Sequence, residues 1–325
     1  MALTSVEFCA GAGGQALGLE LAGFEHKLLV DNDSFCCETL RLNRPDWNIV
    51  HADMREVSGS EYAGADLFAA GLPCPPFSVA GKQLGEKDER NLFPEALRLI
   101  NEIQPKFVLI ENVRGFLDPQ FSDYRKLLRG QLGRLGYDVD WKLLNASEFG
   151  VSQLRPRVAI VAAKVEYWPY FQFPNPQENQ PQTVGELLHD LMAARGWSGA
   201  KIWAKQANGI APTIVGGSKK HGGPDLGPTR ARQAWLKQGV IGSTIAEYAP
   251  DSDFDGTPRL TTRMVARIQG FPDNWEFFGK KTNAYRQVGN AFPPPVAKAL
   301  GERIVSAIQD AERVCVRPPK KQSAQ

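Results

Sequence analysis

Short apolar runs alternate with amphipathic stretches along the first half of the chain, and this alternation limits the possible folds more than any other feature. The runs have the length and composition of buried strands, and the stretches have the periodicity of surface helices. The runs are Ser5–Cys9, Lys27–Asp31, Asp66–Ala70, Lys106–Glu111 and Arg157–Ala163, and the stretches are Gln15–Leu21, Ser34–Asn43, Phe93–Ile103 and Tyr124–Leu135. Strands that alternate with helices predict an α/β fold with a doubly wound, parallel, Rossmann-like sheet.

Four polar or glycine-rich features follow the predicted strands at their carboxyl ends. They are the glycine loop after Cys9, Asp31, the loop that carries Cys74, and Glu111. Ligands of doubly wound sheets bind beyond the carboxyl ends of the strands. We therefore expect these four features to form one site.

Cys74 lies between prolines, in Pro73-Cys74-Pro75-Pro76, directly after a predicted strand. Proline fixes its own φ and biases the residue before it toward extended geometry, so the direction of the thiol is set by the backbone. This arrangement suits a nucleophile. The alternative is that Cys74 is a small buried apolar residue, which is the common fate of a single cysteine.

Gly11-Ala12-Gly13-Gly14 follows the first predicted strand and begins a predicted helix. Glycines at this position let the backbone approach a ligand closely, although tight turns need glycine too. Asp31 ends the second strand, where a carboxylate can accept both hydroxyls of a ribose, and Asp53 follows the next apolar residues. The pattern favours a nucleoside cofactor, and its spacing does not match the GxGxxG of dinucleotide enzymes.

Glu111 ends an apolar strand, and Arg155 and Arg157 precede another. Burial in a partly dry cleft would raise the pKa of Glu111 and make it a proton donor; the alternative is a carboxylate that caps a helix. Because residues i and i+2 of a strand share a face, both arginines can point into one cleft. The alternative for them is a pair of surface salt bridges.

Charge is unevenly distributed although the formal net charge is only +2. Residues 195–237 contain eight basic residues and one acidic residue, a local charge of 8 − 1 = +7, which leaves 2 − 7 = −5 for the remainder. Tryptophans and glycines lie among these basic residues. The segment is either a solvated basic face or a loop-rich surface that binds a polyanion, and its composition favours the second.

Cysteine usage and hydropathy indicate where the protein works. The five cysteines lack metal-ligand spacing and predict no disulfide framework, which suits a reducing compartment. From the sequence we expect neither a signal peptide nor a membrane-spanning apolar run. We expect a cytoplasmic protein that binds no metal and no membrane.

The strand and helix pattern divides the chain. It fades at the Pro- and Gln-rich stretch Tyr170–Gln182, and helical periodicity returns at Thr262–Gln269 and Pro294–Ile308. We expect a catalytic and cofactor-binding domain at 1–165, a smaller, loop-rich recognition domain at 166–258, a hinge at 259–282, a return to the first domain at 283–314 and a disordered tail at 315–325.

Taken together, the motifs resemble those of the bacterial-type DNA (cytosine-5)-methyltransferases, in the order of that family and over nearly the whole chain. The matching motifs are Cys9-Ala10-Gly11-Ala12-Gly13-Gly14, Pro73-Cys74, Glu111-Asn112-Val113, Gln153-x-Arg155-x-Arg157, Arg259-Leu260-Thr261-Thr262-Arg263 with Gln269-Gly270-Phe271-Pro272, and Gln287-Val288-Gly289-Asn290. The resemblance implies a Rossmann-like S-adenosylmethionine-dependent methyltransferase domain with a target-recognition domain. It also implies that a cytosine is flipped out of double-stranded DNA and methylated at C5.

The resemblance assigns a role to each motif. Cys74 would attack C6 of the base, Glu111 would bond to N3 and the exocyclic amine, and Arg157, supported by Arg155, would bind the O2 side. The residues implied to bind S-adenosylmethionine are Gly11, Gly13, Gly14, Asp31, Asn32, Asp53, Met54, Leu92 and Asn290. The residues expected to contact DNA are Gln153, Lys219, Lys220, His221, Arg230 and Arg232.

Three positions depart from the family pattern. Cys9 lies where Phe is usual, Asn32 where an aromatic residue often stacks on adenine, and Pro75 where Gln is common. None of them removes a catalytic group. The resemblance further implies a monomer that works beside a cognate restriction endonuclease or as a solitary modifier.

Other functions remain open at this point. They are an RNA cytosine-5 methyltransferase of the same fold, a catalytically silent DNA-binding module and an NAD-linked oxidoreductase. The Val79–Arg90 loop would close over DNA, or it is a simple surface excursion.

Overall fold

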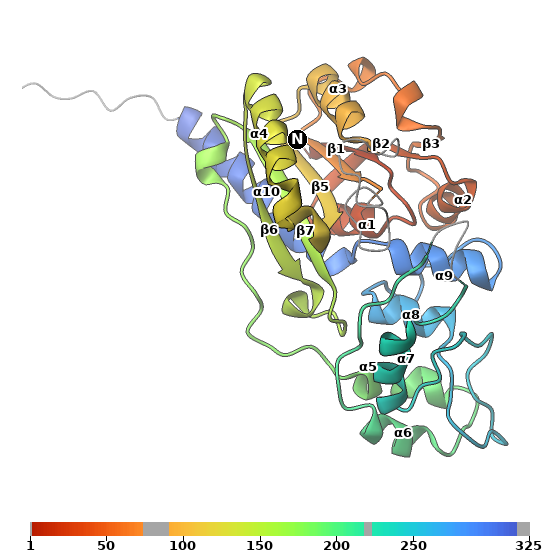
Figure 1. Cartoon of the computed structure of the whole chain (residues 1–325). Coiled ribbons are helices and arrows are strands. Elements are labelled where there is room, and N and C mark those ends of the chain that lie inside the picture. The colour runs from red at the N-terminus through yellow and green to blue at the C-terminus, as the bar shows by residue number, and fades with distance from the viewer. Residues whose placement is uncertain (1, 74–90, 218–222, 317–325) are drawn as a thin grey trace, which may run out of the picture.

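The computed structural model describes residues 2–73, 91–217 and 223–316, and it contains one seven-stranded sheet in the order β3-β2-β1-β4-β5-β7-β6. The first five strands run parallel (Figure 1). The strands are β1 (Leu3–Phe8), β2 (Phe24–Asp31), β3 (Ile49–His51), β4 (Leu67–Gly71), β5 (Phe107–Val113), β6 (Tyr137–Asn145) and β7 (Pro156–Lys164). The predicted α/β class is confirmed.

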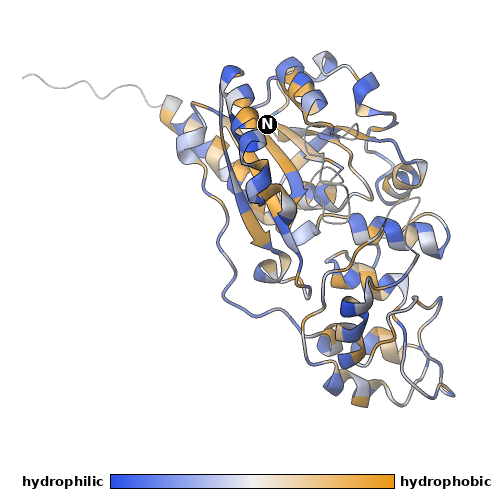
Figure 2. Ribbon diagram, in the orientation of Figure 1, coloured by the Kyte–Doolittle hydropathy of each residue, from blue (hydrophilic) through white to orange (hydrophobic). Residues whose placement is uncertain are grey.

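Helices cover both faces of the sheet. They are α1 (Gly14–Leu21), α2 (Ser34–Asn43), α3 (Phe93–Ile103), α4 (Ser122–Arg134) and α10 (Pro294–Val316). Apolar side chains of α3 and α4 share a core with Val6, Phe8 and other residues on one face, whereas α10 packs with Phe107 and Leu109 on the opposite face. Figure 2 shows apolar residues concentrated in the strands and on the helix sides that face them.

The predicted strand orientation was wrong at one position. β7 pairs antiparallel with both β5 and β6, so the Arg157–Ala163 run is not part of the parallel sheet. β6 was not predicted, because its exposed positions carry polar residues such as Asp138 and Asp140 and break up the apolar run. The sequence of an edge strand with one solvated face alternates between polar and apolar residues.

The second half of the described chain forms a smaller, mainly helical region. Its helices are α5 (Val184–Ala193), α6 (Ala200–Gln206), α7 (Thr229–Lys237), α8 (Thr262–Ile268) and α9 (Lys281–Asn290). Their buried side chains form a core around Trp203, Trp235 and Met264. In Figure 1, α9 lies between this helical region and the sheet.

This core extends from Val184 to Ala291 and also takes in Leu17 of α1 and Leu40 of α2. It therefore crosses the boundaries at 258 and 282 that the sequence predicts, and those boundaries stay predictions. α10 then returns the chain to the sheet, where it packs along α1. Within the described residues, no helix combines the length and apolar character needed to cross a membrane.

Candidate active site

A cavity of about 250 Å³ opens at the carboxyl ends of the parallel strands. Its lining includes Cys9 after β1, Asp31 at the end of β2, Pro73 after β4 and Glu111 of β5. The structure thus brings together the strand-end features that the sequence marks. Cys74 itself lies outside the described residues, but its neighbour Pro73 lines the same cavity as Glu111.

The glycine loop between β1 and α1 is shaped by close approaches. Gly11 has a left-handed φ of +55°, and its N–H donates to Oδ2 of Asp31 over 2.8 Å. A Cβ at Gly14 would lie 2.2 Å from the carbonyl oxygen of Phe292, so only glycine fits there. Gly11 and Gly14 line the cavity.

Gly13 has a different place from the one expected of a cofactor residue. A Cβ at Gly13 would lie 2.6 Å from Cδ2 of Leu40 and 2.9 Å from the ring of Trp275, and its φ is +82°. Gly13 is not among the residues that line the cavity. The position requires glycine for packing and for backbone conformation.

The remaining predicted cofactor residues divide into two groups. Asp31, Asn32, Leu92 and Asn290 line the cavity, together with Gly11 and Gly14. Asp53 and Met54 lie next to it: the Sδ atom of Met54 is 3.8 Å from the thiol of Cys9, which does line the cavity. Burial, reinforced by Asp31, raises the pKa of Cys9, so this thiol is protonated and unreactive at neutral pH.

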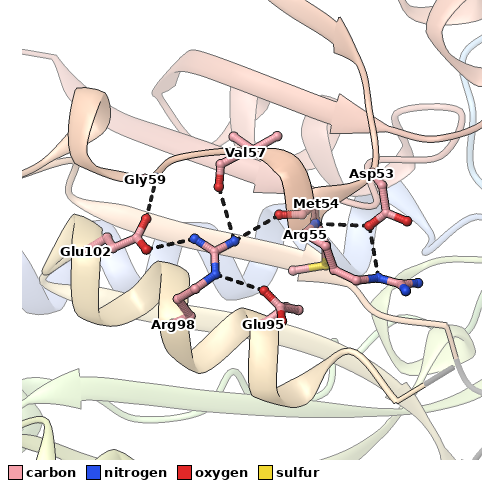
Figure 3. Close-up of polar contacts among 8 residues, drawn as sticks. All are labelled: Asp53, Met54, Arg55, Val57, Gly59, Glu95, Arg98 and Glu102. Carbon is pink, nitrogen blue, oxygen red and sulfur yellow. Dashed lines mark hydrogen bonds and ion pairs between the residues drawn. The ribbon is translucent and has the colours of Figure 1, made fainter. Parts of the chain in front are cut away.

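Arg98 of α3 holds the segment that carries Asp53 and Met54 (Figure 3). Its guanidinium donates to the carbonyl oxygens of Met54 (3.2 Å) and Val57 (3.1 Å). The same group bonds to Glu95 and Glu102 of α3, and Glu102 accepts the N–H of Gly59 over 2.6 Å. Leu92, which lines the cavity, immediately precedes α3. Arg98 therefore connects the helix that follows Leu92 to the segment that carries Met54.

Glu111 and Arg157 form a buried ion pair between β5 and β7. The distance from Arg157 Nε to Glu111 Oε1 is 2.7 Å, and the side chains are only 14% and 10% exposed. Burial raises the pKa of Glu111, against the opposing effect of Arg157 and Arg155. A carboxyl group in this state can hold a proton at a pH where an exposed glutamate would be ionised.

Arg155 does not share the orientation of Arg157. It is fully buried, and its guanidinium donates to the carbonyl oxygens of Ile214 (2.6 Å), Gly289 (3.0 Å) and Ala291 (3.0 Å). Arg155 precedes β7 and Arg157 lies within it, so the expectation that both arginines point into one cleft was wrong. It joins the sheet to the helical region and flanks Asn290.

Gln153 is also placed differently from its prediction as a DNA contact. Its side chain is fully buried, Nε2 donates to Gln269 over 2.5 Å, and Oε1 accepts the N–H of Ile214 over 2.9 Å. The hydroxyl of Thr213 donates to the carbonyl oxygen of Leu154. Residues 153–155 therefore fix the Thr213-Ile214 pair to the sheet, and the Gln153 amide is not exposed for DNA.

Only some of the basic residues predicted to contact DNA lie in the described part of the structure. Arg230 and Arg232 are exposed on α7, whereas Trp235 of the same helix is buried in the core of the helical region. Two residues two positions apart do not share a helix face, so the two arginines point in different directions. Lys219, Lys220 and His221 lie outside the described residues, as does the Val79–Arg90 loop.

The model of the C-5 cytosine-specific DNA methylases matches residues 3–306 of the chain. The chain belongs to this family. The type II methyltransferase M.NgoMIV of Neisseria gonorrhoeae is 54% identical over 312 residues, which cover 95% of this chain and 99% of the relative. The type II methyltransferase M.NaeI of Lentzea aerocolonigenes is 53% identical and covers 94% of this chain and 75% of the relative.

Solved structures of low identity share the fold of this C-5 cytosine-specific DNA methylase. A prophage-encoded protein of Escherichia coli superposes with a TM-score of 0.68 at 23% identity, covering 95% of this chain and all of that one. DNMT2 of Spodoptera frugiperda gives 0.65 at 18% identity, covering 94% of this chain and all of that one. The family predicted from the motifs is confirmed, and the chain is a DNA (cytosine-5-)-methyltransferase.

Several polar residues that line this methylase's cavity were not predicted from the sequence, and two of them are almost fully buried. Glu7 and Gln15 line it, with 1% and 3% of their surface exposed. The signal for Glu7 is a carboxylate within the apolar strand Val6-Glu7-Phe8, where only a functional or paired charge is expected. Gln15 gives no such signal, because a polar residue in a first helical turn is ordinary.

Proposed function

We propose that this methylase uses S-adenosylmethionine to methylate C5 of a flipped cytosine in double-stranded DNA, with Cys74 as the nucleophile. The observation that supports this most strongly is the shared cavity. Asp31, Gly11, Glu111 and Pro73 all line it. A nucleoside cofactor and a reacting base thus have adjacent places at one sheet edge.

The donor groups around the cavity fit S-adenosylmethionine. Asp31 accepts the N–H groups of Gly11 and Asp33 at 2.8 Å each, which fixes its carboxylate at the wall of the cavity. A carboxylate is the kind of group that accepts hydrogen bonds from ribose hydroxyls. Leu92 offers an apolar surface, and Asn290 an amide, on the lining of the same cavity. When bound, this cofactor supplies an electrophilic methyl group on a positively charged sulfur.

The protein must make C5 of cytosine nucleophilic. A bond from the Cys74 sulfur to C6 would place an electron pair at C5, and Glu111 would hold a proton at N3 as negative charge moves there. Arg157 would bind the O2 side and remain paired with Glu111. Once C5 carries the methyl group, transfer of the C5 proton to solvent would re-form the C5–C6 double bond, and the Cys74 sulfur would leave C6 as a thiolate.

The helical region supplies the DNA-binding surface in this proposal. Its exposed cations on α7 and the basic segment around Lys219 and Lys220 would contact phosphates or base edges. The type II relatives support a role in a restriction-modification system, in which this chain would act as a monomer on the site of a cognate endonuclease. The same relatives favour DNA over RNA as the substrate.

Incubation of unmodified genomic DNA with the protein and S-adenosylmethionine tests the proposal, with modified cytosines read by base-conversion sequencing. We expect 5-methylcytosine within one short motif and no turnover by Cys74→Ser, which should still bind DNA. Methylation of RNA alone, or substantial turnover by Cys74→Ser, would overturn the proposal. In a thermal-shift control, S-adenosylmethionine should stabilise the protein and NAD should not.

A further inference from the structure

One helix, α9, lies between the sheet and the helical region (Figure 1). One of its faces forms part of the cavity wall, through Asn283, Arg286, Gln287 and Asn290. Residues three, four and seven positions apart share one side of a helix. A displacement of α9 therefore changes the shape of the cavity.

A loop of the helical region, residues 215–217, packs its backbone against the same helix. A Cβ at Gly289 of α9 would lie 2.4 Å from the amide nitrogen of Gly216. A Cβ at Gly216 would lie 2.3 Å from the carbonyl oxygen of Arg286. Both distances are below those that real Cβ atoms show, so only glycine fits at either position. The loop and the helix thus touch with no side chain between them.

Hydrogen bonds hold the loop 215–217 and the helix together. Asn290, the last residue of α9, donates through Nδ2 to the carbonyl oxygen of Gly217 over 3.2 Å. The guanidinium of Arg155 donates both to the carbonyl oxygen of Ile214 (2.6 Å) and to that of Gly289 (3.0 Å). Asn290 therefore belongs to the cavity wall and to the loop contact at once.

The loop 215–217 also presents a side chain to solvent, within a basic part of the chain. Val215 is 43% exposed, whereas its neighbours Ile214 and Gly216 are buried. The loop lies in the segment 195–237, which contains eight basic residues and one acidic residue. Since such a segment attracts a polyanion, we expect bound DNA to contact this loop.

We propose that the contact between Gly216 and Gly289, with the bond from Asn290, couples DNA binding to cofactor binding. The two glycines are then positioning residues for methyl transfer, and this role rests on the proposed function. DNA on the loop 215–217 holds α9 in place, because no side chain between the backbones can absorb a displacement. The second ligand meets a cavity wall that the first has already ordered, so each binds more tightly in the presence of the other.

A crowded glycine elsewhere in the helical region provides a matched control. A Cβ at Gly185 of α5 would lie 1.9 Å from the carbonyl oxygen of Ala204 in α6. Neither residue lines the cavity. Replacement of Gly185 by Ala therefore causes the same kind of backbone clash outside the proposed route.

Isothermal titration calorimetry with S-adenosylhomocysteine measures the coupling. Its Kd is determined for the protein alone and with a saturating DNA duplex that carries the motif found by sequencing. We expect this duplex to lower the Kd of the wild type by about tenfold, or 1.4 kcal/mol. Gly216→Ala and Gly289→Ala should each reduce this factor to less than about twofold and change the Kd of the protein alone by less than about twofold.

Two measurements distinguish coupling from a loss of stability. The double variant should lose no more coupling than Gly216→Ala or Gly289→Ala, because both changes act at one contact. In methylation assays, each single variant should raise the KM for S-adenosylmethionine by about tenfold and leave kcat within about threefold, since affinity for the bound cofactor is what the contact supplies. Gly185→Ala should unfold at a lower temperature and keep the wild-type coupling.

Asn290→Asp tests the same contact if the alanine variants do not fold. It removes the donor to Gly217 without adding bulk. Because the coupling is a ratio of two Kd values, a direct effect of this substitution on the cofactor appears in both values and cancels. We expect the factor to fall at least twofold below that of the wild type.

The outcomes separate the proposed coupling from the proposed function. Equal affinity of the wild type for S-adenosylhomocysteine with and without DNA would overturn the coupling, and so would wild-type coupling in both Gly216→Ala and Gly289→Ala. An equal loss in Gly185→Ala would also overturn it, because general loosening would then explain the effect. If the folded wild type binds no S-adenosylhomocysteine in either condition, the proposed use of S-adenosylmethionine fails instead.

Discussion

The strand-end site and the helical region place their polar side chains by different means. In the sheet, Glu111 and Arg157 lie near each other because β5 and β7 pair in a fixed register, with Val113 opposite Arg157. In the helical region, by contrast, Arg230 and Arg232 take their positions from the packing of α7 through Trp235. Sheet pairing therefore positions the proposed catalytic pair, whereas side-chain packing positions the exposed arginines of α7.

Replacement of Glu111 by Gln is the strongest test of the sheet side of this comparison. The variant keeps the shape and a hydrogen bond but cannot exchange the proton, so we expect kcat to fall by roughly 10²–10⁴-fold. Because burial raises the pKa of Glu111, wild-type kcat should fall as the pH rises through that value. Methylation rates over a range of pH measure both effects. A kcat within tenfold of the wild type would remove Glu111 from proton transfer.

The sequence predicts site residues that sheet pairing positions better than residues that other packing positions. Apolar runs and the glycine loop are enough to predict β1, β2, β4, β5 and the edge where Asp31 and Glu111 lie, since strand ends of one sheet converge. The rule that residues i and i+2 of a strand share a face does not predict that Arg155 and Arg157 point to different places. Arg155 precedes the strand and bonds to carbonyl groups about 60 and 135 residues away, at Ile214 and near Asn290. The buried place of Gln153 was missed for the same reason.

Arg155→Met and Arg157→Met should separate stability from catalysis. Arg155→Met leaves three buried carbonyl groups without their charged donor, so we expect the free energy of unfolding to fall by about 2–4 kcal/mol. Arg157→Met should cost less stability and more kcat, because Arg157 pairs with Glu111 at the site. Urea unfolding and methylation rates, measured on both variants, give the comparison. Equal stability losses would show that the two arginines share one role.

Replacement of Arg98 tests whether contacts from helix α3 also position the segment that carries the predicted cofactor residues Asp53 and Met54. Arg98→Met removes two hydrogen bonds to the main chain of the Asp53–Gly59 segment, and we expect the Kd of S-adenosylhomocysteine to rise by about 3–10-fold. Arg98→Lys should restore part of the affinity. Arg313→Met is the control, since Arg313 pairs with Asp310 on α10 at the surface. A similar loss in both variants would mean that Arg98 has no specific effect on this edge.

The smallest effects are expected on the helical side, where single cations act additively. Arg230→Ala and Arg232→Ala should each weaken DNA binding and reduce the slope of log K against log salt by about 0.9 for each phosphate that the removed guanidinium neutralises. Because the two arginines point in different directions on α7, we expect one of them to account for most of the change. Lys126→Ala on α4, whose exposed side chain pairs with Asp123, is the control and should leave the slope unchanged. If neither arginine alters the slope, α7 does not contact phosphates, and the basic surface for DNA must lie in another part of the segment 195–237.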